Sequence, residues 1–472
     1  MLILQLAAYL TVIQGGIEMA ISRFVARAEF TGEGEHARKI IWAAGFLLVL
    51  GAGGLAIATL SASLYLDVLF PSIPYGLAAS ARYALLVVGL AYSINLPFSI
   101  LAGAFQGHQR YEINALATSA GKMATAGGVM WTALHGGSLL AMGLWAAFGA
   151  FLQSAIYVAA WLKNRGRMIL GRSRLHLRAA KEFMRFCSAM LATQFAGVLI
   201  TGLDLPIVAA FDFHSAGYYA AAITACNVFL VPYTAILSTL IPVASGMTAN
   251  HSPSEIGTLL LRVTRYSTAL LLVMSLPLLV GMRSLLSIWL GSDYSQHTVW
   301  FAVVLVIAQL VRLAMFPYSI IGFGGGQQAR MLYSAAGEAL VNLALSLILV
   351  RTIGALGVAI GTLIGAFVGT CLHFGVSIPL TDCVAVDRAA LFKHGIWKPL
   401  WVALPAALIG LWISRMATSA ALEVASACLT AIGVALSEYY LVLTSEERAA
   451  LGASLALYLG HRRPAPGYVS IS

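Results

Sequence analysis

Charged and amide side chains inside long apolar stretches are the residues of this chain whose types could do chemistry. Lys122 lies within ATSAGKMATAGG, and Arg312 lies within IAQLVRLAMFPYS with Gln309 three residues before it on the same helical face. A charge inside a membrane span costs at least ~2.5–3.5 kcal/mol by insertion scales, so each one needs a partner or a purpose. Lysine can hold a phosphate as a point charge, and the arginine fork suits bidentate phosphate contact. We predict that both cations line a cavity, and the alternative is that they form structural ion pairs. For Gln309 we predict a role in gating or ion coupling.

Acidic residues in similar stretches indicate gating or ion coupling. Glu338 lies in SAAGEALVNLALS with Asn342 one helical turn later, and Asp204 lies in TGLDLPIVAAF just before a proline. A Glu338–Lys122 pair that forms in one state and breaks in another would bias the equilibrium between the states, and local pairing with Arg312 is the alternative. The acid at a proline kink, Asp204, could bind a proton or a sodium ion, or could be structural.

The sequence repeats one frame at a distance of 220 residues. LPFSILAGAFQGHQR at 96–110 shares Pro, an aromatic residue, Ser, Ile and the final Arg with FPYSIIGFGGGQQAR at 316–330, and GSLLAMG and ALGVAIG share Ala-x-Gly at an offset of 218. We expect the repeated arginines, Arg110 and Arg330, on a turn at the inner mouth, where they attract an anionic ligand or serve only as topogenic charge. An offset of about 220 residues corresponds to six predicted spans. Because six is an even number, the two halves run in the same direction through a membrane.

The composition identifies the elements that must position these residues. The 472 residues are 60% hydrophobic and only 10% charged, with a mean hydropathy of +0.87, whereas soluble domains carry roughly 25% charged residues. Stretches of about 20 apolar residues cross ~30 Å of hydrocarbon, and they must be helices because backbone groups in lipid pair internally. We predict an all-α integral membrane protein with about 13 spans, at 2–22, 40–60, 83–104, 113–134, 139–161, 184–210, 217–244, 264–288, 298–322, 331–350, 354–378, 398–415 and 421–443.

Basic residues orient the predicted spans. When the loop after the first span is placed inside, 22 of the 28 Lys and Arg residues fall inside and four, Arg82, Arg283, Arg351 and Arg415, fall outside. The other two, Lys122 and Arg312, lie within spans. This asymmetry fits the positive-inside rule and places the C-terminus in the cytoplasm and the N-terminus outside. The net charge of +10 then faces anionic lipid head groups rather than nucleic acid.

Motifs for catalysis, metals and nucleotides are absent from the sequence. The five cysteines are scattered without metal or disulfide spacing, and the glycine-rich stretch at 322–326 lacks the Lys-Ser/Thr of a nucleotide-binding loop. We therefore expect a protein that is not an enzyme and that binds no metal or organic cofactor, with H+ or Na+ coupling left open.

The predicted organisation has five parts. They are a helical bundle at 1–162, a basic cytoplasmic linker at 163–183, a second bundle at 184–380, two additional spans with a surface helix at 381–460, and a disordered tail at 461–472. Capping boxes at SPSE (252–255) and TSEE (444–447) each predict the start of a helix that lies in the membrane interface.

Several stretches carry a family resemblance: GGIEMAISRFVARAEFTGE, AGAFQGHQRYEINALA, LDLPIVAAFDFHSAGYYAAA, SLLSIWLGSDY and EALVNLALSLILVRTIGALGVAIGT. In these stretches the chain resembles the polysaccharide-biosynthesis, Wzx-type flippase branch of the multidrug/oligosaccharidyl-lipid/polysaccharide exporter superfamily. The resemblance implies two helical bundles around a cavity. It implies movement of an undecaprenyl-diphosphate-linked oligosaccharide from the inner to the outer leaflet of a bacterial plasma membrane by alternating access. A polysaccharide polymerase and chain-length proteins are the implied partners. We expect the first of the usual fourteen helices to be missing here.

Three alternatives remain open. A multidrug cation exporter of the same superfamily usually works with cavity acids, whereas the candidates here are basic or balanced. A lipid II flippase, as the resemblance implies, carries cations in its first helix and in the helix corresponding to 217–244, and that stretch contains no Lys or Arg. A membrane glycosyltransferase or polymerase would need a sizeable outer loop with catalytic residues, and the predicted outer loops are short.

Overall fold

The structure is a computed structural model that is helical wherever it assigns regular structure. It describes residues 17–18, 21–22, 24–25, 34–66, 75–164, 181, 183–184, 195–238, 240, 244, 247, 251–325 and 327–449. No strand occurs within these ranges, which confirms the predicted all-α class. The chain divides into two compact units, with Met1–Ala220 and Ala335–Gly365 in unit 1, and Ala221–Ser334 and Ala366–Ser472 in unit 2.

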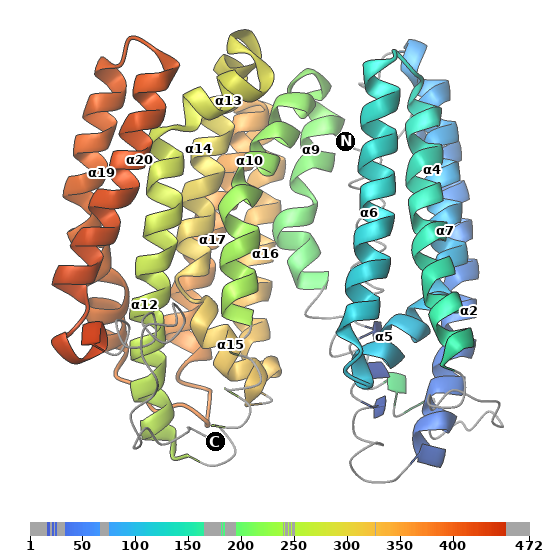
Figure 1. The fold of residues 1–472 in the computed structure, drawn as a ribbon, viewed down its shortest axis with the longest axis horizontal. Coiled ribbons are helices and arrows are strands. Elements are labelled where there is room, and N and C mark those ends of the chain that lie inside the picture. The colour runs from blue at the N-terminus through green and yellow to red at the C-terminus, as the bar shows by residue number, and fades with distance from the viewer. Residues whose placement is uncertain are drawn as a thin grey trace. The chain divides into compact units, whose positions relative to one another are not determined.

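Unit 1 contains two sets of helices that are distant in sequence. The first set is α2 (Gly34–Leu64), α4 (Tyr75–Asn95), the 3-10 turn η1 (Leu96–Phe98), α5 (Ser99–Gly107), α6 (Tyr111–Leu134) and α7 (Leu139–Lys163). Within it α6 packs on α7, α7 on α4 and α4 on α2 (Figure 1). The second set is the π-helical turn η3 (Val198–Gly202), α9 (Asp204–Phe211), the first turns of α10 (Phe213–Ser238), most of α16 (Gln328–Ile353) and the first part of α17 (Ala355–Leu372).

Unit 2 contains the rest of the described chain. Its elements are the remainder of α10, α16 and α17, with α12 (Pro253–Val280), α13 (Met282–Leu290), α14 (Ser292–Leu313), α15 (Phe316–Gly324), η4 (His373–Ser377), α18 (Arg388–Ala390), η5 (Leu391–Trp397), α19 (Lys398–Met416), α20 (Ala420–Ser437) and η6 (Glu438–Val442). Helix α12 packs against α14, α19 and α20, and α13 packs against α14 and α20.

Ten helices of the described residues are long and apolar enough to cross a membrane. The predicted span at 113–134 is the helix α6, which is long enough but is not among these ten. The predicted span at 184–210 is described from residue 195, where a shorter apolar helix runs from Phe195 to Phe211. Most of the predicted span at 2–22 and most of the predicted basic linker at 163–183 lie outside the described residues, as does the predicted tail at 461–472.

Prolines break the two spans that carry the repeated frame. Pro97 lies in the 3-10 turn between α4 and α5, and Pro317 lies in the first turn of α15 after a turn at Ala314 and Met315. Proline cannot donate the backbone hydrogen bond that a continuous helix needs. The continuous span predicted at 298–322 is therefore wrong, and Arg312 lies in the last turn of α14 rather than mid-span.

The surface helix predicted to start at SPSE is also wrong. Ser252 and Glu255 do form the predicted capping box, but the helix that begins there continues unbroken to Val280 and is itself one of the ten apolar helices. The span is shifted towards the N-terminus relative to the prediction of 264–288, because it ends at Gly281. The capping motif therefore predicted the start of the helix correctly, whereas the predicted type of helix, one lying in the membrane interface, was wrong.

The order and spacing of five helices recur along the chain. Helices α2, α4, α5, α6 and α7 are followed in the same order by α12, α14, α15, α16 and α17, which each begin 216 to 219 residues later. The tight turns before α7 and α17 contain Gly136 at φ +65° and Gly354 at φ +63°. Residues other than glycine rarely adopt this backbone conformation. This spacing supports the proposed duplication.

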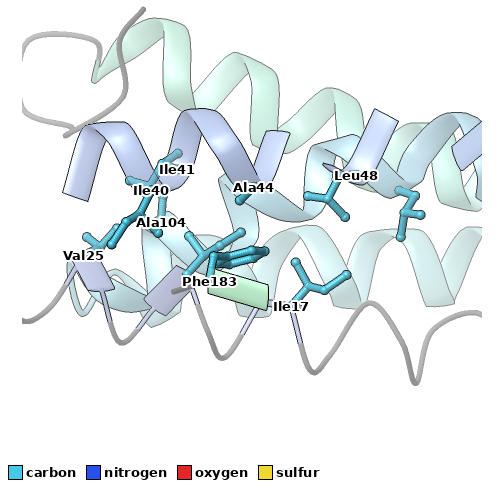
Figure 2. Packing of buried hydrophobic residues seen from close by; sticks show 10 residues of the cluster. Ile17, Val25, Ile40, Ile41, Ala44, Leu48, Ala104 and Phe183 are labelled. Carbon is cyan, nitrogen blue, oxygen red and sulfur yellow. The ribbon is translucent and has the colours of Figure 1, made fainter. Parts of the chain in front are cut away.

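Buried aliphatic residues hold α2 and α5 together in unit 1. Figure 2 shows Val25, Ile40 and Ala104 converging with Phe183. Ile40 and Val25 have no exposed surface. Close packing of this kind stabilises helix pairs in lipid, where burial alone gives little driving force.

A second capping box lies near the end of the described chain. The backbone N–H of Thr444 donates to Glu447 Oε2 at 2.9 Å, and Glu447 N–H donates to Thr444 Oγ1 at 3.3 Å. Glu447 also forms an ion pair with Arg265 of α12. Burial raises the pKa of Glu447, but hydrogen bonds from Tyr266 and the Thr444 backbone, with the Arg265 charge, outweigh burial and lower it overall. This contact fastens the segment after η6 to α12.

Candidate functional site: a buried polar cluster

Three glycines of α17 create the close helix contact on which the site depends. A Cβ on Gly357 would meet the Leu349 carbonyl oxygen at 2.4 Å, one on Gly361 would meet the Ser346 nitrogen at 2.8 Å, and one on Gly365 would meet Asn342 Cβ at 2.8 Å. The glycines are spaced four residues apart and so form one face of α17. Such stripes of small residues let membrane helices approach closely.

Asp204 is the buried carboxylate of the site. It is 4% exposed at the start of α9, and its Oδ2 accepts hydrogen bonds from Thr362 Oγ1 at 2.8 Å and from the Tyr219 hydroxyl at 3.3 Å. Hydrogen bonds to a carboxylate are stronger than neutral ones and offset part of the cost of burying it. The fold thus holds one acid inside a shell of hydroxyl groups.

Asn342 connects this acid to α16. Its Oδ1 accepts from Ser346 Oγ at 3.0 Å and lies 3.3 Å from Thr362 Oγ1, while its Nδ2 donates to the Ile200 carbonyl. Ile200 belongs to the π-helical turn η3 just before Asp204. Such turns interrupt the regular ladder of backbone hydrogen bonds and occur frequently at functional sites.

Glu338 extends the same face of α16 by one turn. Glu338, Asn342 and Ser346 are spaced four residues apart, and they are 5%, 1% and 1% exposed. The structure therefore brings together three of the residues predicted for gating or coupling: Asp204 and Asn342 in one hydrogen-bonded network, and Glu338 one turn away.

The sequence reading missed three members of this cluster: Tyr219, Ser346 and Thr362. A usable signal was present, because Ser346 continues the four-residue spacing from Asn342 and Thr362 lies directly after Gly361 in the glycine stripe. Tyr219 had no comparable signal, since nothing in the sequence brings it near Asp204.

The predicted cavity cation of unit 1, Lys122, has no contact with the buried cluster among the interactions of the described residues. Lys122 is exposed on α6, next to Gly121, whose face packs so closely on α7 that a Cβ would meet the Gly149 carbonyl at 2.8 Å. No ion pair of Lys122 is present among the described residues, so the hypothesised Lys122–Glu338 pair is not formed in this structure. That Lys122 lines a cavity stays a prediction.

Arg312 and Gln309 meet as their spacing predicts. The Arg312 guanidinium donates to Gln309 Oε1 at 2.9 Å, and both side chains are half-buried in unit 2. The hydrogen bond orients the guanidinium near the end of α14. Gln309 is therefore a neighbour of a predicted cavity cation and not part of the buried cluster.

The repeated turn arginines each have an acidic neighbour. Arg110 Nε lies 2.8 Å from Glu112 Oε1, and an Arg330 guanidinium nitrogen lies 3.6 Å from Asp382 Oδ2. Both pairs are largely exposed, so each contributes little to stability. The two arginines occupy corresponding turns, before α6 and at the start of α16.

The oxygen atoms gathered around Asp204 are of the kind that bind small cations. Within the described ranges, no group of three or more His, Cys, Asp or Glu side chains gathers as a transition metal would require. One carboxylate surrounded by hydroxyl and amide oxygens suits a proton or a hard cation, which prefers oxygen ligands.

Residues 1–248 match the family model described as polysaccharide biosynthesis protein, which covers more than half of the chain. The chain belongs to the polysaccharide biosynthesis protein family. No curated protein matches this family member.

Solved structures share the fold at low sequence identity. The lipid II flippase MurJ in an inward closed conformation matches with a TM-score of 0.69 and 14% identity, over 92% of each chain. An inward-facing multidrug resistance transporter of the MATE family, in the MOP superfamily, matches with a TM-score of 0.64 and 14% identity over 82% of this chain and 89% of its own. The MATE transporter ClbM in complex with Rb+ matches with a TM-score of 0.52 and 15% identity over 82% and 86%. This family member is thus a multi-pass membrane protein with a MurJ- and MATE-like fold.

Proposed function

We propose that the protein is a flippase that moves an undecaprenyl-diphosphate-linked oligosaccharide from the cytoplasmic to the outer leaflet by alternating access. The observation that carries the proposal is membership of a polysaccharide biosynthesis family combined with a transporter fold. The product would feed exopolysaccharide, capsule or O-antigen synthesis. The protein would act in the bacterial inner membrane with its C-terminus in the cytoplasm, beside a polymerase and chain-length proteins, and it would not act as an enzyme.

The predicted cavity cations would hold the anionic diphosphate. Lys122 lies exposed on α6, the one long helix of the first set that is not apolar enough to count among the ten candidate spans. A helix face with a lysine and small residues suits a water-filled cavity better than lipid. Arg312, held by Gln309, would be the cation of unit 2, and Arg110 and Arg330 would attract the diphosphate at the inner mouth.

The buried cluster would couple transport to a cation. A proton or sodium ion at Asp204 would change the charge of a network that ties α9 to α16 and α17, so it would favour one conformation over another. The Rb+ complex of a MATE transporter with this fold supports a monovalent cation as the coupling species.

The test is deletion and complementation. Cells without the gene should accumulate undecaprenyl-diphosphate-linked repeat units inside and lose surface polysaccharide, and wild type should restore both. Lys122→Ala and Arg312→Ala, present at normal membrane levels, should restore surface polysaccharide about tenfold less well than wild type, whereas Arg351→Ala, a predicted outer-face control, should restore it fully. Unchanged lipid intermediates with increased drug sensitivity would overturn the proposal in favour of a multidrug exporter.

A lipid II flippase is the second candidate, because MurJ shares the fold over 92% of each chain. Helix α10, which covers the described part of the stretch where that activity is expected to need cations, contains no Lys or Arg. Complementation of a lipid II flippase depletion strain separates the two, since growth would be restored only if lipid II is the substrate.

A further inference from the structure

An apolar groove lies in unit 2 between α12, α14 and α19. It has a volume of about 700 Å³ and is within the range of ordinary ligand sites. Its apolar walls include Leu276, Trp300, Val303, Ile307, Leu408 and Leu411. Arg283 and Arg415 are the two charged residues that line it. The groove therefore combines an apolar trough with two cations.

A smaller polar pocket adjoins the groove. It has a volume of about 230 Å³ and shares Arg283 and Gln296 with the groove. Its remaining lining is dominated by hydroxyl groups, from Ser287, Ser292, Ser295 and Ser419 among others, together with Glu423. The Ser284 hydroxyl donates to Glu423, so that acid is already oriented by the protein.

The two arginines are placed to hold an anion at a membrane surface. Arg283 follows the end of α12 and Arg415 lies in the last turn of α19, and α13 and the turn after α19 lie at one end of the bundle (Figure 1). Both arginines are exposed, and neither forms an ion pair within the described part of the chain. They are two of only four basic residues predicted on the outer face. Basic residues are scarce on the predicted outer face, yet two of them line this one groove.

We propose that this site binds an anionic phospholipid with a hydroxylated head group, namely phosphatidylglycerol. An acyl chain would lie in the apolar groove, the phosphate would bind the two arginine forks, and the glycerol hydroxyls would enter the serine-rich pocket. The head group proposed here is a glycerol phosphate, whereas the proposed cargo carries a diphosphate and sugars. The lipid is distinct from that cargo, and the inference does not depend on the proposed function.

The test measures lipid binding to the purified, delipidated protein by native mass spectrometry and by thermal melting. Phosphatidylglycerol should bind at least tenfold more tightly than phosphatidylcholine with the same acyl chains, and should raise Tm. The double variant Arg283→Gln/Arg415→Gln should remove this preference. The matched control Arg351→Gln, at an arginine predicted on the same face but outside the groove, should keep it.

A second variant tests the groove without changing its charge. Ile307→Trp should fill the trough and weaken phosphatidylglycerol binding at least tenfold while the protein stays folded. Equal binding of both phospholipids, or binding that neither variant changes, would overturn the proposal. Displacement of phosphatidylglycerol by an equimolar amount of undecaprenyl diphosphate would also overturn it, because the site would then belong to the cargo.

Discussion

The helix pairs α6–α7 and α16–α17 occupy corresponding places in the two proposed repeats and differ in the exposure of their charged residue. Both pairs pack through glycine, at Gly121 and Gly149 in the first and at Gly361 in the second. Lys122 lies exposed on α6, whereas Glu338, which is 216 residues later, is 5% exposed on α16. Similar helix pairs therefore leave a cation exposed in one case and bury an acid in the other.

This difference shows how a duplicated fold can divide two tasks. Close packing at glycine is common to both pairs and holds the two helices of each pair together. The polar residues added around it differ: α16 and α17 supply Asn342, Ser346 and Thr362 to a buried network. In the proposed mechanism the first pair contacts the cargo and the second binds the coupling ion.

The largest expected effect comes from filling the glycine contacts. Gly361→Leu and Gly149→Leu place side-chain carbons against backbone atoms that cannot move aside, since their Cβ positions already lie 2.8 Å from the Ser346 nitrogen and 2.5 Å from the Gly121 carbonyl. Overpacking costs typically ~1–3 kcal/mol, and backbone contacts place these variants at the upper end. Membrane levels and Tm should fall sharply for both. The control Gly127→Leu on α6, where a Cβ meets nothing within 4 Å, should match wild type; equal losses in all three would contradict the packing argument.

The next largest effect is expected from removing the charge of the buried acid Asp204 while keeping its shape. Asp204→Asn keeps the shape and accepts the same hydrogen bonds but cannot bind a proton or cation as a carboxylate does. Surface polysaccharide in the deletion strain should fall at least tenfold at a normal membrane level. We expect sodium or lower pH to raise the Tm of the wild type, because a ligand stabilises only the state that binds it, and we expect this rise to be absent in the variant. Asp382→Asn, at an exposed acid, should retain both responses.

A smaller effect tests the exposed and buried charges directly. Lys122→Ala should reduce complementation about tenfold without changing Tm, because the side chain has no ion pair to lose in the described structure. Glu338→Ala should lower Tm, since removing a buried polar group leaves its surroundings unsatisfied at a cost of ~1–3 kcal/mol. Lys122→Arg is the control and should retain most activity. Identical Tm losses at both positions would remove the contrast between the two helix pairs.

The repeated turns should respond weakly and alike. Arg110→Ala and Arg330→Ala each break an exposed ion pair worth less than about 1 kcal/mol, so Tm should change little in either repeat. Complementation should fall by no more than about threefold and should fall further in the double variant. A tenfold loss from one single variant would show that the two turns have different tasks.

The smallest effect is a pH dependence outside both helix pairs. The pKa of Glu447 is lowered in the folded protein, so its stabilising contribution is fully present above the ordinary carboxyl pKa and is lost as pH falls through the folded value. The Tm difference between wild type and Glu447→Gln should therefore be a few degrees at neutral pH and shrink on acidification below about pH 4.5. A difference that grows with acidification would contradict the assigned direction.

Much of this architecture followed from local sequence. Apolar length predicted most of the ten helices that, in the described part of the chain, are long and apolar enough to cross a membrane. The capping boxes at Ser252 and Thr444 formed as predicted. The i+3 spacing of Gln309 and Arg312 correctly predicted their contact, because a helix sets that geometry by itself. Helix breaks were less predictable: Pro317 was visible in the sequence, yet its separation of α14 from α15 required the backbone geometry on both sides.

The sequence by itself determined the membrane class, the helical periodicity, the family and the identity of the acids worth attention. Only the tertiary structure decided which of those acids share an environment. Asp204, Tyr219, Asn342 and Thr362 come from four segments up to 158 residues apart, and their meeting depends on the closeness of α16 and α17 at the glycine stripe. Periodicity assigns a residue to a face of its own helix, but which faces meet is set by packing between distant helices, and no local pattern encodes that choice.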